Sequence, residues 1–252
     1  MAGFISGNFF TMVDKGRVRA INEDFADARL NAYGHLILVV ADGMGGQNCG
    51  DFASSTIGNG LINDFFEIEK PFKNEKQAEK WLYRTINKFN RIIYQKAHED
   101  IRFSGTGTTL TCAIIFGENL VVAQVGDSRL YKINELNQLE QMTIDQSYVQ
   151  HLVATGKISP SQVSTHPERH KLTNAIGIRF NAMVDIKSYR YNGEKLLLCS
   201  DGLYNNVPFY DIQSILKSRE SPERKCHQFI AFGNSNGGSD NMAVVIWEDN
   251  HQ

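Results

Sequence analysis

The chain of 252 residues is 42 % hydrophobic and 21 % charged, values typical of a soluble globular protein with a sizeable core. Its formal net charge of −2 argues against general affinity for nucleic acids or for an anionic membrane surface. Because the sequence shows neither a signal-peptide pattern nor an apolar run of roughly 20 residues, we expect a cytoplasmic protein without a membrane-spanning segment.

The first half of the chain predicts three strands followed by two helices. The strands are expected over residues 8–14, 17–30 and 35–41, and the helices over about 49–69 and 76–101. Polar residues interrupt the second strand at 22–24. The helices are assigned because apolar side chains recur at helical spacing, and a charged segment around Pro71 separates them.

The second half predicts short strands joined by turns, with a few helices. Strands are expected over 108–116, 120–126, 128–133, 186–191, 195–200 and 242–247, and helices over about 146–155, 208–218 and 222–232. Strands in hairpins and helices in pairs favour antiparallel sheets covered by helices over alternating βαβ units. The sequence shows no linker or repeat, so we interpret residues 1–252 as one domain. The long polar stretch 156–180 lacks clear periodicity, which is typical of a functional lid.

The apolar run Leu36–Val40 is typical of a strand buried on both faces, and the strand is expected to end at Asp42. Gly43, Gly45 and Gly46 follow, and glycines favour a turn at this point. A carboxylate at a strand end, beside bare backbone, can hold a hard cation with a neighbouring carbonyl as a second oxygen ligand. One such motif taken alone is more often an ordinary Asp-Gly turn.

Three further acids repeat this arrangement. Asp127, Asp201 and Asp240 each adjoin an apolar strand and a small turn-forming residue, and Glu23 and Asp24 interrupt the second strand. If the sheets bring these positions to one edge, the carboxylates crowd together and raise one another's pKa values. Divalent cations resolve that conflict, and an all-oxygen cluster suits Mg²⁺ or Mn²⁺. The sequence has no Cys/His cluster with zinc spacing, so the pattern predicts a magnesium or manganese site.

Six motifs, in this order, resemble the metal-dependent protein phosphatase (PPM, protein phosphatase 2C-like) family, and its bacterial Ser/Thr phosphatases above all. They extend from Arg17 to Val245 and read RVRAINED, VVADGMGG, GTGTTL, VGDSRLYK, LLLCSDGLYNNV and GSDNMAVV. The resemblance implies an α+β fold: a four-layer α-β-β-α sandwich with two central antiparallel sheets flanked by helices. Residues 1–252 would then be a single phosphatase catalytic domain.

The resemblance also implies which residues hold two Mn²⁺ or Mg²⁺ ions. Asp42 would bridge the two ions, and the carbonyl of Gly43 would complete one site. Asp201 and Asp240 would bind the second ion. Asp24 would hold the ion or a water bound to it.

Other acids would support this centre. Glu23 lies beside Asp24 in the N-E-D motif, and Asp127 would bind, with Asp201, a third and weaker ion. Asp145 is interpreted as a residue that supports the ligands rather than one that binds an ion.

Arg19 matches the family's phosphate-binding arginine, four residues before Glu23. A guanidinium suits this role because its planar fork donates two hydrogen bonds to phosphate oxygens. Asp42 and Arg19 would be the catalytic residues. The implied reaction is hydrolysis of phosphoserine or phosphothreonine by a hydroxide shared between the two metals, without a phosphoenzyme. No cysteine is followed at the sixth position by an arginine, so the signature of the covalent alternative is missing.

The sequence departs from the family at two positions. Met44 stands where some eukaryotic members carry a general-acid histidine, and Gln146 stands where relatives have the histidine of a D-H-S motif. Residues 156–180 resemble the family's mobile flap, which borders the metal site and influences substrate access. Within it, Arg179 is a further candidate for substrate contact.

The partners implied are phosphorylated proteins and a cognate Ser/Thr kinase in a bacterial signalling system, with the phosphatase acting as a monomer. Two other interpretations stay open: a catalytically silent binding module, and a different two-metal hydrolase such as a nuclease. A silent module is expected to lack a metal acid, whereas here all are present. A nuclease is expected to carry basic runs, whereas here Lys and Arg are scattered.

Overall fold

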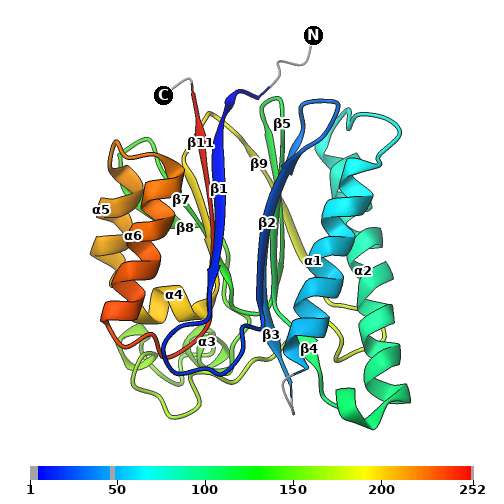
Figure 1. Ribbon diagram of the computed structural model, residues 1–252, viewed down its shortest axis with the longest axis vertical. Helices are drawn as coiled ribbons and strands as arrows, with labels where there is room; N and C mark the ends of the chain where they lie inside the picture. Colours follow the sequence, from blue (N-terminus) through cyan, green and yellow to red (C-terminus); the bar gives the residue numbers. More distant parts are fainter. Residues whose placement is uncertain (1–4, 46–48, 251–252) are drawn as a thin grey trace.

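Figure 1 shows the computed structural model of the chain, which describes residues 5–45 and 49–250. Two antiparallel sheets stack face to face, and helices cover the outer face of each. The predicted α+β sandwich with layers α-β-β-α is therefore confirmed. Among the described helices, none combines the length and the apolar composition needed to cross a bilayer.

The first sheet has the strand order β1-β11-β10-β7-β8. Its strands are β1 (Gly7–Asp14), β11 (Met242–Asp249), β10 (Leu196–Cys199), β7 (Arg129–Ile133) and β8 (Leu139–Gln141). Its outer face is covered by α5 (Phe209–Lys217) and α6 (Pro222–Ser235). The short helices α3 (Tyr148–Ala154) and α4 (Asp201–Asn206) lie at one end of the sandwich (Figure 1).

The second sheet has the order β2-β3-β5-β6-β9, and β4 pairs with β3 beside this path. Its strands are β2 (Asp24–Leu30), β3 (Leu36–Met44), β4 (Gly107–Thr108), β5 (Leu110–Phe116), β6 (Asn119–Val125) and β9 (Asp185–Arg190). Its outer face is covered by α1 (Gly50–Phe66) and α2 (Glu75–Glu99). Single turns of 3₁₀ helix occur at Ile101–Phe103 and Pro160–Gln162.

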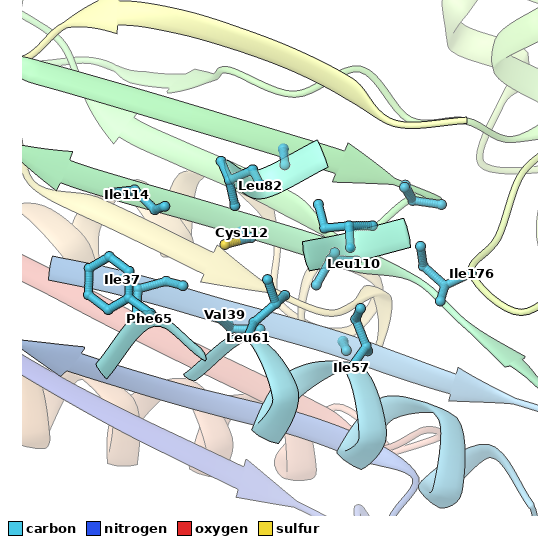
Figure 2. Packing of buried hydrophobic residues seen from close by; sticks show 14 of the residues in the cluster. Ile37, Val39, Ile57, Leu61, Phe65, Leu82, Leu110, Cys112, Ile114 and Ile176 are labelled. Atoms are coloured by element: carbon cyan, nitrogen blue, oxygen red, sulfur yellow. The ribbon is translucent and has the colours of Figure 1, made fainter. Parts of the chain in front are cut away.

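Side chains of β3 alternate between two cores, which explains its unbroken apolar run. Ile37 and Val39 are fully buried in the core beneath α1 and α2 (Figure 2). Leu36, Leu38 and Val40 are buried between the two sheets. A strand with both faces buried fixes its register strongly, because a shift of one residue would exchange the two sets. The position of Asp42 at the end of β3 is thus set by the packing of the whole strand.

The strand predicted over 17–30 contains only β2 at its C-terminal end. The preceding residues form turns because one side chain holds them away from the sheet. The amide nitrogen of Asn241 donates to the carbonyls of Lys15 and Ile21 at 2.9 Å each. Its amide oxygen accepts a hydrogen bond from the N–H of Glu23 at 2.9 Å. These bonds satisfy backbone groups that a strand would have paired in a ladder.

The turn predicted directly after Asp42 is wrong at Gly43, because β3 continues through it and pairs with β4. Gly43 serves close packing instead. A Cβ at this position would lie 2.3 Å from the carbonyl oxygen of Gly50 and 2.5 Å from that of Glu23. The predicted glycine turn also included Gly46, which lies outside the described residues.

Candidate functional site

A cavity of about 910 Å³ is lined by residues from the end of β3 and the start of α4. Figure 1 shows that these two ends lie at the same end of the sandwich. The cavity brings together residues that are far apart in the sequence. Seven of the predicted site residues line it, namely Arg19, Glu23, Asp42, Gly43, Asp127, Asp201 and Asp240. Asp24 and Asp145 are not among its lining residues.

Threonines of the GTGTTL motif hold the backbone of Asp42. The N–H of Asp42 donates to Oγ1 of Thr109 at 3.0 Å. Its carbonyl accepts from Oγ1 of Thr108 at 2.9 Å and from the N–H of Thr109 at 2.8 Å. Thr109 is linked in turn to Ser128, whose Oγ lies 2.6 Å from its own. The motif therefore fixes the backbone of Asp42 and connects it to the loop that carries Asp127.

Asp24 lies opposite Asp42 in the ladder between β2 and β3, behind the cavity. Its Oδ2 accepts a hydrogen bond from the hydroxyl of Ser200 at 2.6 Å. The oxygen of that hydroxyl in turn accepts a hydrogen bond from the N–H of Ala243 at 2.8 Å. Its Oδ1 is buried, and none of the described residues donates a hydrogen bond to it. Ser200 directly precedes Asp201, the first residue of α4. One hydroxyl thus connects two of the predicted ligands.

Asp240 forms an ion pair with Arg19, whose Nη2 lies 2.8 Å from its Oδ2. This hydrogen bond raises the pKa of Arg19. The backbone at Asn241 approaches α4 so closely that a Cβ on Gly202 would clash with the carbonyl oxygen of Asn241. A larger residue at Gly202 would therefore push Asp201 and Asp240 apart.

The carboxylates carry more negative charge than the site neutralises. Burial raises the pKa of Asp24 to about 7, reinforced by the charge of Asp201 and opposed by the hydrogen bond from Ser200. Burial, and then the charge of Asp201, raises the pKa of Asp127 to about 7. The pKa of Asp42 also lies well above its usual range, through burial and then the charges of Asp24 and Asp201. A site with this surplus favours cations or protons.

This donor set fits hard divalent cations. The cavity is lined by residues with carboxylate and carbonyl oxygens. Beside it, paired with Asp42 in the ladder, Asp24 has a buried carboxylate oxygen to which none of the described residues donates. Within residues 5–45 and 49–250, no three His, Cys, Asp or Glu side chains are placed to hold an ion among themselves. That geometry disfavours a closed zinc site but is compatible with Mg²⁺, which takes one or two carboxylates and keeps several waters.

A model of the protein phosphatase 2C family matches residues 16–231 of the chain. The chain belongs to this family. Serine/threonine phosphatase stp of Listeria welshimeri is 38 % identical to it over 238 residues, which cover 94 % of each chain. Protein phosphatase PhpP of Streptococcus pneumoniae is 29 % identical over 242 residues, which cover 96 % of this chain and 97 % of that one.

Solved structures of protein phosphatase 2C-type proteins share the whole fold. Serine/threonine phosphatase Stp1 from Staphylococcus aureus is similar at a TM-score of 0.89 and 35 % identity, over 98 % of this chain and 96 % of that one. The catalytic domain of PstP, described in complex with two manganese ions, is similar at a TM-score of 0.82 and 29 % identity, over 97 % of this chain and 99 % of that one. The predicted family is confirmed, while the metal-binding roles of individual residues stay predictions.

The family resemblance did not reveal what Asp145 does. Its carboxylate accepts three hydrogen bonds from Arg129, at 3.0 and 3.1 Å from Nε and 2.6 Å from Nη2. The guanidinium carbon of Arg129 lies 3.5 Å from the ring centre of Tyr204. The hydroxyl of Tyr204 donates to the carbonyl of Asp127 at 3.1 Å. Asp145 therefore orders a stack that supports the loop of Asp127, and neither Arg129 nor Tyr204 was singled out from the sequence.

Gln146, which replaces the expected histidine, connects this loop to the segment after residue 170. Its side-chain oxygen accepts from the N–H of Gly126 at 3.0 Å and from the amide of Asn174 at 2.7 Å. Its carbonyl accepts from the N–H of Thr173 at 2.8 Å. In this protein Gln146 therefore connects the loop that carries Asp127 to the segment around Thr173 and Asn174.

We expect the metal-free protein to lose stability as the pH rises from about 4 to about 7. Asp24 and Asp127 have ordinary pKa values of 3.8, which the fold raises to about 7. In this window the folded state keeps protons that the unfolded state has lost, so each pH increment favours unfolding. A loss of about 2 kcal/mol would lower the Tm by roughly 4–8 °C.

The measurement is a series of thermal melts between pH 4.5 and 7.5 in a buffer containing a chelator. Asp24→Asn is the matched variant, since an amide oxygen can still accept the bond from Ser200 while the charge is gone. Its Tm should depend less on pH than that of the wild type. Parallel curves for the two proteins would contradict the assignment of the effect to Asp24.

Proposed function

We propose that this chain hydrolyses phosphoserine and phosphothreonine in phosphorylated proteins with the help of two divalent cations. The observation that carries the proposal is the gathering of Asp42, Asp201 and Asp240 around one cavity, with Arg19 beside them. Membership of the protein phosphatase 2C family supports the same activity, since the relatives described above are named Ser/Thr phosphatases.

The cavity offers the oxygen ligands that Mn²⁺ and Mg²⁺ prefer. Asp42 would bridge the two ions, and the carbonyl of Gly43 would complete one site. Asp201 and Asp240 would hold the second ion. Asp24 would act from behind, because its buried Oδ1 has no donor among the described residues and can accept a hydrogen bond from water.

The two remaining acids differ in what they contact. The side chain of Glu23 accepts a hydrogen bond from the N–H of Gly50 at 2.7 Å, so it secures the start of α1 beside the cavity. The charge of Asp201 contributes to the raised pKa of Asp127, so the two carboxylates lie near each other. This pair would support the third, weaker ion.

Bound cations would lower the pKa of a water and neutralise charge that develops on the phosphoryl oxygens. Arg19 would bind the phosphate through its planar fork, exchanging its present contact with Asp240 for phosphate oxygens. Met44 lines the cavity but has no proton to give, so the proton for the departing serine or threonine oxygen would come from water.

The finer assignments belong to the same proposal. Residues 1–252 would act as a single catalytic domain with 156–180 as its flap, in the cytoplasm, as a monomer, and against one cognate Ser/Thr kinase.

A silent binding module is disfavoured because no predicted ligand is replaced. A nuclease is disfavoured by the net charge of −2.

Removal of metal is the direct test. We expect hydrolysis of p-nitrophenyl phosphate and of a phosphoserine peptide to fall to background after thorough chelation and to return with Mn²⁺ or Mg²⁺. Titration of each ion against both substrates would decide which supports turnover better. Activity that survives chelation would overturn the metal-dependent mechanism, and no activity under any condition would overturn the function.

Arg19→Ala is expected to raise the KM for a phosphopeptide by about ten- to hundredfold, the loss of a charged hydrogen bond worth roughly 1.5–3 kcal/mol. Arg19→Lys keeps the charge but not the fork, so it should recover only part of that loss. The concentration of Mn²⁺ that gives half-maximal activity should change much less. An unchanged KM in Arg19→Ala would argue against phosphate binding by this residue.

A further inference from the structure

Two smaller cavities adjoin the main one and continue it along the surface. One of about 220 Å³ shares Met44 and Leu172 with the main cavity. The other, of about 480 Å³, shares Ile178 with the first of the two. The shared side chains show that the three hollows are neighbours in a row. We call the two smaller hollows together the side groove.

The side groove has exposed polar residues in its walls, among them Glu99, Thr173 and Arg179, but exposed apolar side chains run along it as well. Ile101, on the far side, is 87 % exposed, and Ile178, in the middle, is 44 % exposed. Ile178 and Met44 meet above Gly107, since a Cβ built there would lie 3.1 Å from the terminal carbon of each. Exposed apolar side chains that adjoin one another in a hollow are typical of a binding site.

The backbone that carries Ile178 is held firmly. Ile176 and Thr108 exchange two backbone hydrogen bonds, at 2.9 and 3.1 Å. The side chain of Asn90, fully buried on α2, accepts from the N–H of Gly177 at 2.8 Å and donates to the carbonyl of Arg179 at 2.9 Å. These bonds anchor the C-terminal end of the 156–180 segment, so the backbone at Ile178 loses little entropy when a ligand binds there.

We propose that the side groove binds the polypeptide on one side of the phosphorylated residue and prefers an apolar side chain there. This inference rests on the proposed function, which places the phosphate in the main cavity. Residues next to the phosphoserine must leave that cavity, and an extended chain advances about 3.3–3.6 Å per residue. Met44 and Leu172 border both hollows, so a neighbouring side chain reaches the groove within a few residues of the phosphate.

The first experiment compares phosphoserine peptides that carry leucine or serine beside the phosphorylated residue, on its N-terminal or its C-terminal side. For the wild type, the KM should be lower with leucine on one of the two sides. Ile178→Ala should raise the KM of the preferred leucine peptide about five- to tenfold and that of the serine peptide much less. Leu136→Ala, which truncates a 77 % exposed side chain in the turn between β7 and β8, should change neither KM.

A second experiment needs no turnover. The dephosphorylated leucine peptide is titrated into protein labelled at the isoleucine δ1 methyl groups, and the shifts of their NMR signals are followed. Ile178 and Ile101 should shift, whereas Ile144, also exposed but outside the groove, should not.

Equal KM values for leucine and serine peptides, or unmoved Ile178 and Ile101 signals, would overturn the side groove while wild-type hydrolysis of p-nitrophenyl phosphate keeps the proposed function intact. Shifts of these signals with protein concentration alone would show that a second copy occupies the groove, and would overturn a role in substrate choice. Absence of hydrolysis with every substrate would instead overturn the function itself.

Discussion

Asp42→Asn is expected to lower the kcat for phosphopeptide hydrolysis by at least about 10²–10³-fold while the protein stays folded. Burial raises the pKa of Asp42, and the charges of Asp24, Asp201, Asp127 and Asp240 raise it further, so this carboxylate interacts with all four neighbouring acids. An amide at this position removes the charge on which the proposed bridging of two cations depends. Every contact of the Asp42 backbone with the threonines of β4 and its neighbour remains possible.

The same substitution should not destabilise the metal-free protein. Removing a buried charge that its neighbours repel relieves the cluster, so at pH 7.5 with a chelator the Tm should equal or exceed that of the wild type. Added Mn²⁺ should raise the Tm of the wild type more than that of the variant. Asp64→Asn, which alters a half-buried carboxylate on α1 paired with Lys88 and distant from the cavity residues, is the control and should behave as the wild type in all three measurements.

Asp201→Asn and Asp240→Asn are expected to lose nearly all turnover for the same reason, also with the fold intact. Circular dichroism and thermal melts separate the two effects. Full activity in Asp42→Asn would refute the two-cation centre. Unfolding of all three variants would instead show that these acids are structural.

Much of the fold could be predicted because local patterns agreed with it. The continuous apolar run of β3 requires burial on both faces, and strands in hairpins exclude a parallel sheet. The short strand β8 escaped prediction, since only Leu139 of its three residues is buried. The predicted strand over 17–30 failed because Asn241, more than 200 residues away, bonds the backbone of its first part. No local pattern contains that information.

The candidate site was predicted from acids at strand ends, and the structure brings those acids to one cavity. Its supports were harder to find. The sequence presents Thr109, Ser200 and Asn241 as ordinary polar residues, and only the packing of distant segments shows that they bond the backbone or carboxylates of the site. The turn expected at Gly43 was wrong, because β3 continues through it, whereas the predicted role of its carbonyl as a ligand stays a prediction.

Asp145→Ala is expected to cost about 3–5 kcal/mol of stability, because it leaves the charge of Arg129 enclosed without the carboxylate that neutralises it. The side chains of Arg129 and Asp145 are only 22 % and 14 % exposed. For a chain of this size, 3 kcal/mol corresponds to a fall of roughly 6–12 °C in Tm. Urea unfolding gives the change in free energy directly.

The control is Asp64→Ala, which breaks the ion pair with Lys88. The N–O distance of 2.8 Å in this pair is similar to that between Arg129 and Asp145, but the side chain of Lys88 is 56 % exposed and that of Asp64 is 28 % exposed. Exposed pairs contribute about 0–1 kcal/mol, so this variant should be nearly neutral. Equal losses in Asp145→Ala and Asp64→Ala would show that burial of the Arg129 pair adds nothing.

A double variant, Arg129→Met with Asp145→Leu, separates the charge from the geometry. Apolar replacements of a buried pair are often neutral for stability, so its Tm should recover most of the loss. Activity should not recover with it. Arg129 lies against the ring of Tyr204, whose hydroxyl holds the carbonyl of Asp127, and a methionine places no planar cation there. A stable double variant with wild-type kcat would show that the stack under Asp127 only supports the fold, whereas a stable variant with reduced kcat would show that it also orders the site.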